Sequence, residues 1–254
     1  MQNQNKTVLK SLQILNLFLD HEQLSFQEIV QLSRLPKTSA HRMVSSLEDM
    51  GFLSRNMDGK YELGLLFLQF GHLVAERLNI RKVALPIMRR LKEETGEAVN
   101  LVVRDDNEAI YIEKVDTTER LRVYTQIGRR APLYGGACPR ILLAFLPEQE
   151  RERYIEQTEL ISYANQTITD KQVLRDVLRD CRKNGFSISH SELENDSSAI
   201  GAPIFNYESR AVAGISVVGA EIRFRNEQYA QNLVAKVTEA ARDISYLLGW
   251  KPSQ

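Results

Sequence analysis

The spacing of apolar positions in Leu35–Gly51, LPKTSAHRMVSSLEDMG, predicts one amphipathic helix. Its apolar stripe consists of Ala40, Met43, Val44, Leu47 and Met50. The opposite face carries small polar side chains and one guanidinium, namely Thr38, Ser39 and Arg42, with Ser45 and Ser46 behind them. Pro36 favours a helical first turn, and Gly51 is typical of the position after a helix. Because no carboxylate occurs from residue 34 to residue 47, this polar face suits the base edges and phosphates of a DNA major groove.

The neighbouring segments match those of a winged helix-turn-helix. Ser25 and Glu28 form a capping-box pattern that predicts a short helix over Phe26–Leu32, and residues 33–36 separate it from the next helix. Two strand-like runs, residues 52–55 and 60–63, flank an Asp-Gly turn. An ordinary amphipathic surface helix with a solvated face is the alternative for the central helix taken alone. The order helix, turn, helix, hairpin favours the DNA-binding motif.

Two further apolar segments complete the N-terminal region. Lys6–Leu19 is predicted to be a first helix that covers the other two. Leu65–Ala75 is nearly apolar all round, too short to span a membrane and too apolar for the small winged domain to bury alone. We expect a linker helix that packs against a second subunit, with packing on the chain's own second domain as the alternative. The expected divisions are residues 1–64, 65–80 and 81–254.

From residue 80 onward, helical and strand-like patterns are mixed, which predicts an α+β sheet domain. The expected helices are Ile80–Thr95, Arg140–Leu146, Glu148–Thr158, Asp170–Lys183 (with Thr169 as its N-cap) and Asn226–Gly249. The expected strands are Val99–Val103, Ala109–Val115, Leu121–Ile127, Phe186–Ser189, Ala202–Asn206 and Ala211–Gly219. A tight loop is expected at Gly135–Pro139.

Composition indicates a globular protein of the cytoplasm. Hydrophobic residues make up 43% and charged residues 26% of the 254 positions. No apolar run approaches the roughly 20 residues of a membrane helix, and the N-terminus lacks a signal-peptide core. Net charge is zero, and within residues 1–63 the basic and acidic side chains also cancel. Attraction for DNA must therefore come from local cations around the predicted recognition helix.

The sequence shows no catalytic or metal-binding pattern, so we expect neither an enzyme nor a cofactor. It lacks a nucleophile elbow, a phosphate-binding loop, a dinucleotide fingerprint and a zinc-protease motif. Cys138 and Cys181 are the only cysteines and are expected to be reduced thiols. The four histidines are scattered without the spacing of metal ligands.

Several polar groups in the second half are candidates for binding a small molecule. Gly135–Ala137 is expected to leave backbone N–H groups without partners at the start of a helix, where they can bind a carboxylate. The alternative is a tight turn that needs small residues for packing. Ser189 and Ser216 end or interrupt strands and are candidates for the same pocket, although a buried serine more often bonds its own backbone. Arg129 and Arg130 are expected to bind a ligand carboxylate, to be solvated or to form an ion pair between subunits. The acidic side chains at 192, 194 and 196 are expected to be solvated or to pair with an arginine.

The whole chain, over residues 6–250, resembles an IclR-family transcriptional regulator. Residues 35–55 are similar to that family's recognition helix and wing. Gly128–Leu146, Ala199–Phe205 and Ala213–Gly219 are similar to its later motifs, in the same order. The resemblance implies an N-terminal winged helix-turn-helix, a linker helix and a C-terminal GAF-like effector-binding domain. It also implies a homodimer or a dimer of dimers, a palindromic double-stranded DNA operator, a small-molecule carboxylate effector and no association with membrane.

These implications assign residues to two sites. The DNA-binding residues are expected to be Lys37, Thr38, Ser39, His41 and Arg42 on the helix, with Arg55 and Lys60 on the wing. The effector-binding residues implied by register are Gly136, Ala137, Cys138, Ser189, Ala199, Ser216 and Val218. Of the strand positions, only Ser216 matches the family's usual residue, and Pro139-Arg140 stands where the family usually has Gly-Lys.

Within the family, two groups of repressors share further segments with this chain. The first group, sugar-acid-responsive repressors of pectin breakdown, has segments similar to Tyr124, Ile127–Arg130 and Pro132–Tyr134. Residues 1–55, Gly135–Cys138 and Ser191–Phe205 resemble a repressor of an operon that encodes a sporulation-kinase inhibitor and 5-oxoprolinase subunits. We therefore expect an operon repressor controlled by a small carboxylate. The alternatives are a sugar-acid-responsive repressor or activator and, from another class, an enzyme with an accessory winged helix.

Overall fold

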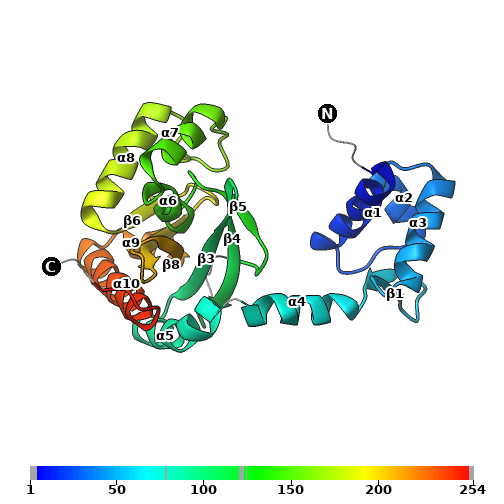
Figure 1. The fold of residues 1–254 in the computed structure, drawn as a ribbon, viewed down its shortest axis with the longest axis horizontal. Helices are drawn as coiled ribbons and strands as arrows, with labels where there is room; N and C mark the ends of the chain where they lie inside the picture. The colour runs from blue at the N-terminus through cyan, green and yellow to red at the C-terminus, as the bar shows by residue number, and fades with distance from the viewer. Residues whose placement is uncertain (1–4, 78, 120–122, 124, 252–254) are drawn as a thin grey trace. The chain divides into compact units, whose positions relative to one another are not determined.

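The computed structural model describes residues 5–77, 79–119, 123 and 125–251. They form two compact units, Met1–Leu78 and Asn79–Gln254, each with its own core. The fold is the predicted α+β combination of an N-terminal winged helix-turn-helix and a C-terminal sheet domain (Figure 1). No helix in the described part of the chain is long and apolar enough to cross a membrane.

The N-terminal unit has the predicted winged helix-turn-helix. Its elements are α1 (Lys6–Asn16), a 3-10 turn (Leu17–Leu19), α2 (Phe26–Ser33), α3 (Lys37–Asp49), β1 (Leu53–Arg55), β2 (Tyr61–Leu63) and α4 (Leu66–Arg77). The capping box is present, since Ser25 Oγ accepts from Glu28 N at 3.3 Å and Glu28 Oε2 accepts from Ser25 N at 2.7 Å. The core joins the three helices to the hairpin through Ile14, Phe18, Leu24, Ile29, Leu35, Ala40, Val44, Leu47, Leu53 and Tyr61.

The predicted apolar stripe of α3 is buried except at its end. Ala40, Val44 and Leu47 lie in the core, and Met43 packs against it. Met50 is 63% exposed, so its predicted place in the stripe is wrong. The reason is that α3 ends at Asp49 and the chain turns at Gly51, whose φ is +76°.

Helix α4 is only partly covered within its own unit. The ring of Phe52 contacts Phe67 edge-on and stacks on Phe70, with centroid distances of 5.6 and 6.2 Å. Leu65, just before the helix, and Leu68 and Leu73 within it stay 82%, 72% and 55% exposed. An exposed apolar surface of this kind is typical of an interaction site.

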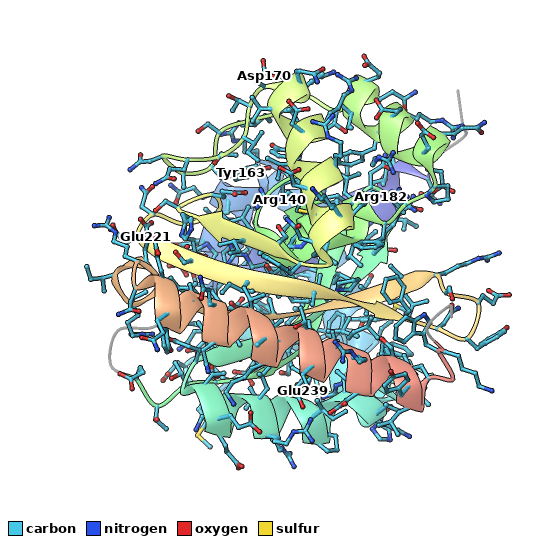
Figure 2. The ribbon with its side chains drawn as sticks, turned by 90° about the vertical axis from the view of Figure 1, so that its left-hand side faces the viewer. Arg140, Tyr163, Asp170, Arg182, Glu221 and Glu239 are labelled. Atoms are coloured by element: carbon cyan, nitrogen blue, oxygen red, sulfur yellow. The ribbon has the colours of Figure 1, made fainter. Side chains whose placement is uncertain are left out.

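The C-terminal unit is built on one antiparallel six-stranded sheet with the order β5-β4-β3-β8-β7-β6. Its strands are β3 (Ala98–Asp105), β4 (Glu108–Val115), β5 (Arg130–Pro132), β6 (Ser187–His190), β7 (Ser197–Phe205) and β8 (Ala211–Ala220). Its helices are α5 (Asn79–Thr95), α6 (Ala137–Ala144), α7 (Glu148–Gln157), α8 (Lys171–Asn184), α9 (Glu221–Phe224) and α10 (Glu227–Leu247). In Figure 2 the sheet lies between α8 on one side and α10 with α5 on the other.

Several predicted boundaries in this unit are wrong. Helix α6 begins at Ala137 rather than Arg140, because Pro139 is tolerated in the first turn of a helix and does not end the loop. Strand β7 begins at Ser197 rather than Ala202, since its first residues are small and carry little strand signal. The N-cap of α8 is Asp170 instead of Thr169. Of the expected strand Leu121–Ile127, residues 121, 122 and 124 lie outside the described residues, and the others form no strand, whereas β5 lies just after it.

Candidate DNA interface and small-molecule cavity

The predicted reading face of α3 is available to a partner. Lys37, Thr38, His41 and Arg42 are exposed, and Ser39 is half-buried. Among the residues that the structure describes, Arg42 has no ion-pair or hydrogen-bond partner for its guanidinium. A solvated cation without an internal partner can bind phosphate or a guanine edge without first breaking a bond inside the protein.

The position of α3 is fixed by contacts from the segments around it. Gln13 Nε2 of α1 donates to the carbonyl of Ser33 at 2.9 Å, which ties the end of α2 to α1. Arg34 closes α2 in a left-handed conformation with φ +55°. The ring of His41 contacts Phe26 edge-on at 5.6 Å, and Ser46 Oγ donates back to the carbonyl of Arg42 at 2.9 Å. The hydroxyl of Ser46 is therefore engaged within the helix rather than directed at a partner.

The wing holds its two predicted cations differently. Arg55 Nε donates to the carbonyl of Gly59 at 3.0 Å, and its guanidinium carbon lies 5.5 Å from the ring centroid of Tyr61. The turn itself is held by Asn56, whose Oδ1 accepts from the backbone N–H of Lys60 at 3.0 Å. Lys60 is half-buried. Hydrogen bonds from Ser25 hold the pKa of Glu28 below its usual value, and the charge of Lys60 adds to this effect.

The residues predicted for the small-molecule site line one cavity. Gly136, Ala137, Cys138, Ser189, Ala199, Ser216 and Val218 lie around it, together with Asn100, Tyr111, Val123, Thr125, Arg129, Pro139, Glu192, Leu193, Glu194 and Ser197. It lies between the N-terminus of α6 and one face of the sheet, where strand register places Ser216 beside Gly201 and Val218 beside Ala199. The cavity measures about 40 Å³, room for a few water molecules, so a larger ligand must displace some of these side chains.

Two glycines shape the start of α6 and its contact with the sheet. Gly136, the N-cap residue, has φ +79°, a conformation that L side chains rarely adopt. A Cβ on Gly201 would lie 3.1 Å from the backbone of Ala137 and Cys138. The close approach therefore depends on the missing side chain at residue 201.

The backbone donors at the start of α6 are not bare, contrary to the sequence-based expectation. Gly136 N donates to Glu192 Oε2 at 3.0 Å, and Ala137 N donates to Ser189 Oγ at 3.0 Å. A carboxylate already lies at this helix start, and it belongs to the protein. The expectation failed because Glu192 follows the glycine loop by more than fifty residues, which spacing along the chain does not reveal.

Glu192 is also the partner of a buried arginine. Arg140 Nη1 donates to both of its carboxylate oxygens, at 2.8 and 2.7 Å, and the two side chains are 1% and 7% exposed. Arg140 Nε donates to Ser187 Oγ at 3.0 Å, and Nη2 donates to the carbonyl of Ile188 at 2.5 Å. Figure 2 shows Arg140 between the sheet and α8. Of the two expected fates for Glu192, pairing with an arginine is the one observed.

The other predicted cations of this region are paired as well. Arg129, which lines the cavity, donates from Nη1 to Glu194 Oε1 at 2.5 Å. Arg130 pairs with Asp105 and Glu108 at the edge of the sheet. A ligand carboxylate that binds Arg129 must therefore compete with Glu194.

Burial favours the neutral forms of one thiol and one phenol that line the cavity. Burial raises the pKa of the Cys138 thiol to about 12, although a hydrogen bond with Ser216 opposes the shift. Burial also raises the pKa of Tyr111 well above its usual value. A thiol in this state is a poor nucleophile at neutral pH. Within the described residues, no group of three histidine, cysteine or acidic side chains is arranged to hold a metal ion.

Several cavity residues were missed from the sequence, and Asn100 is the one whose hydrogen bonding is unusual. Asn100 lies in β3 directly beside Ser216 of β8, and it is 3% exposed. Its Oδ1 is buried and has no hydrogen-bond partner. The sequence feature that could have identified Asn100 is a single amide at an inward-facing position of the apolar run Val99–Val103.

Comparisons with known proteins agree with both halves of the chain. Residues 7–56 match the family model of the IclR helix-turn-helix domain, and residues 72–246 match that of the bacterial transcriptional regulator IclR C-terminal region. The chain is 55% identical over 250 residues to the HTH-type transcriptional regulator KipR of Bacillus subtilis (strain 168), covering 98% of this chain and 100% of that protein.

Two solved structures of IclR-family regulators match the chain over nearly its whole length. The Thermotoga maritima IclR is 31% identical with a TM-score of 0.82, and the match covers 96% of this chain and 99% of that one. An IclR homologue from Microbacterium hydrocarbonoxydans, solved with 4-hydroxybenzoate, is 26% identical with a TM-score of 0.84 over the same shares. These matches span both domains and the predicted recognition helix. The chain therefore belongs to the IclR family and is a DNA-binding transcriptional regulator.

Proposed function

We propose that the protein acts in the cytoplasm as a repressor that binds a palindromic operator as a homodimer, with α3 in the major groove. The observation that carries the proposal is the exposed polar face of α3, where the guanidinium of Arg42 has no partner within the described residues. The apolar stripe of α3 is buried in the core of the unit, so that stripe cannot enter a groove and the exposed polar face can.

The side chains of α3 and the wing take different parts in this proposal. Thr38, Ser39 and Arg42 reach base edges, with Lys37 and His41 beside them. Arg55 is held by the wing turn and contacts phosphate or the minor groove, as does Lys60. Lys60 contributes less than Arg55, because it is half-buried and its charge already acts on Glu28.

The homodimer is proposed to form through α4. Its exposed leucines supply an apolar surface that the winged domain leaves uncovered. A two-fold arrangement of this helix would place two copies of α3 on successive turns of DNA, which is the geometry that a palindromic operator requires. A dimer of dimers is compatible with the same interface.

The cavity is proposed to bind a small effector, a carboxylate in the class that the family resemblance implies. The neutral thiol of Cys138 supports binding without chemical conversion, so no catalytic role is proposed. The Microbacterium homologue was solved with 4-hydroxybenzoate, which supports a small organic acid as ligand. The operon with 5-oxoprolinase genes, which the sequence resemblance implies, is proposed as the target.

The effector is proposed to change operator affinity by favouring one of two arrangements of the dimer. The cavity has room for a few water molecules, so an acid larger than these would move the lining side chains, of which those at Glu192–Glu194 are the candidates. An effector can shift DNA binding only by its difference in affinity for the two arrangements.

The proposal is tested by footprinting the protein on the DNA upstream of the genes it is found beside. Arg42→Ala should weaken specific binding by about 1–3 kcal/mol, which is roughly 5- to 150-fold. Ser46→Ala is the matched control, because its hydroxyl bonds the carbonyl of Arg42 within the same helix and should leave the footprint unchanged. Equal footprints for wild type and Arg42→Ala would rule out this reading face.

A further inference from the structure

The side chain of Asn100 has an unsatisfied hydrogen-bonding atom at the cavity. Its Oδ1 is buried and without a donor, and the residue is 3% exposed. Buried acceptors almost always have a partner, so one without it calls for an explanation. Asn100 is one of the residues that line the cavity, so a donor group of a bound ligand is a candidate partner for this atom.

Three of the polar side chains that line the cavity, those of Glu192, Glu194 and Ser189, already have hydrogen-bond partners. Glu192 accepts from Arg140 and from Gly136 N, and Glu194 accepts from Arg129. Ser189 Oγ accepts from Ala137 N. Within the described lining, Asn100 Oδ1 is thus a buried acceptor left for a ligand to satisfy.

The position of Asn100 on the sheet places it within reach of the same ligand as Ser216. The two residues pair across β3 and β8, and paired residues of adjacent strands project from the same face. Val102, two residues along β3, packs into the cluster that also contains Cys138 of α6, so this face is the one that α6 covers.

We propose that Asn100 determines the ligand specificity of the cavity by accepting a hydrogen bond from an O–H or N–H group of the effector. This inference rests on the proposed function, since it names the class of molecule that the effector cavity takes. The class is a small hydroxy acid or a small amide, including a lactam. An acid with no such donor leaves Oδ1 unsatisfied and binds less well.

The first test needs no ligand. Asn100→Leu keeps the approximate volume of the side chain and removes the unsatisfied amide. The full-length variant should therefore melt at a higher temperature than the wild type in the absence of any added compound. A lower melting temperature would show that the amide is satisfied within the folded protein, and it would overturn the proposal.

The second test compares pairs of compounds that differ in one donor. Lactate and propionate differ by a hydroxyl, and 2-pyrrolidone and γ-butyrolactone differ by an N–H. Wild type should bind the donor-bearing member of at least one pair about tenfold more tightly, as measured by calorimetry. Asn100→Leu should lose that preference. Equal binding within both pairs by the wild type, or an unchanged preference in the variant, would overturn the proposal.

Operator binding separates this inference from the proposed function. The binding of the wild type to operator DNA, without ligand, is therefore measured beside the two tests. If none of the four compounds binds the wild type, the proposed ligand class is wrong while DNA binding stands. If the wild type fails to bind operator DNA, the proposed function itself fails.

Discussion

Replacement of Glu192 by glutamine tests how the buried arginine holds the cavity wall together. The glutamine keeps one oxygen that can accept from Gly136 N, but it carries no charge. Arg140, which is 1% exposed, would then lie in the interior without a counter-charge. Its remaining acceptors, Ser187 Oγ and the carbonyl of Ile188, are both neutral.

The expected cost follows from the burial of the pair. Removing one partner of a buried ion pair destabilises a protein by about 3–5 kcal/mol, because the other charge stays uncompensated. For a domain of this size, 1 kcal/mol moves the melting temperature by about 2–4 °C, so the change should be roughly 6–20 °C. The double variant Glu192→Gln/Arg140→Met removes both charges and should recover much of the loss.

The fluorescence of Trp250 reports on this unit alone. It is the single tryptophan of the chain, and its ring stacks on Phe205 and Tyr246 at centroid distances of 5.4 and 5.6 Å. Urea unfolding followed at this residue therefore measures the stability of the C-terminal unit.

A surface ion pair provides the control. Arg175 pairs with Glu152 and Glu156 on partly exposed helices, and Arg175→Ala should cost less than about 1 kcal/mol. If Glu192→Gln were as mild as Arg175→Ala, the buried pair would not stabilise the cavity wall and the reasoning would be refuted.

Three further predictions concern packing, association and the thiols. Gly201→Val should lower the free energy of unfolding by about 1–3 kcal/mol in the same urea assay, because the valine side chain would meet the backbone of α6. A urea midpoint equal to that of the wild type would contradict this close approach. If the homodimer forms through α4 as proposed, Leu68→Glu should produce a monomer in sedimentation. Leu19→Glu, at an equally exposed leucine outside α4, should leave the dimer intact. A dimer of Leu68→Glu would place the interface elsewhere. Cys138 should resist a thiol reagent at pH 8 until the protein unfolds. Rapid labelling of the native protein would contradict the burial of this thiol. The free energy of unfolding should also fall as pH rises above 9.0, the thiol's ordinary pKa, because between that pH and about 12 the thiol ionises only in the unfolded protein.

The DNA-binding half could be predicted from sequence because its signals are local. The capping box at Ser25 and Glu28, Pro36 before α3 and the helical spacing of Ala40, Val44 and Leu47 each act within a few residues. Their burial pattern and boundaries match the structure closely. Met50 was misplaced because periodicity alone does not show where a helix ends.

The cavity could be predicted only in part. Register within the family placed seven residues, from Gly136 to Val218, around one cavity, and all of them line it. The partners of those residues could not be predicted, because Arg140 and Glu192 meet only after α6 packs on the sheet. The unsatisfied amide of Asn100 is also a property of the folded cavity, since it depends on which donors the neighbouring strands bring near.

The central claim is that the exposed face of α3 reads bases through Arg42. It is tested most directly by selecting binding sites from randomised DNA with the wild type, Arg42→Ala and Arg42→Lys. We predict a palindrome for the wild type, with loss of preference at one base pair of each half-site in Arg42→Ala and only partial recovery in Arg42→Lys, which keeps the charge but cannot form the bidentate contact. Identical base preferences in all three proteins would contradict the claim.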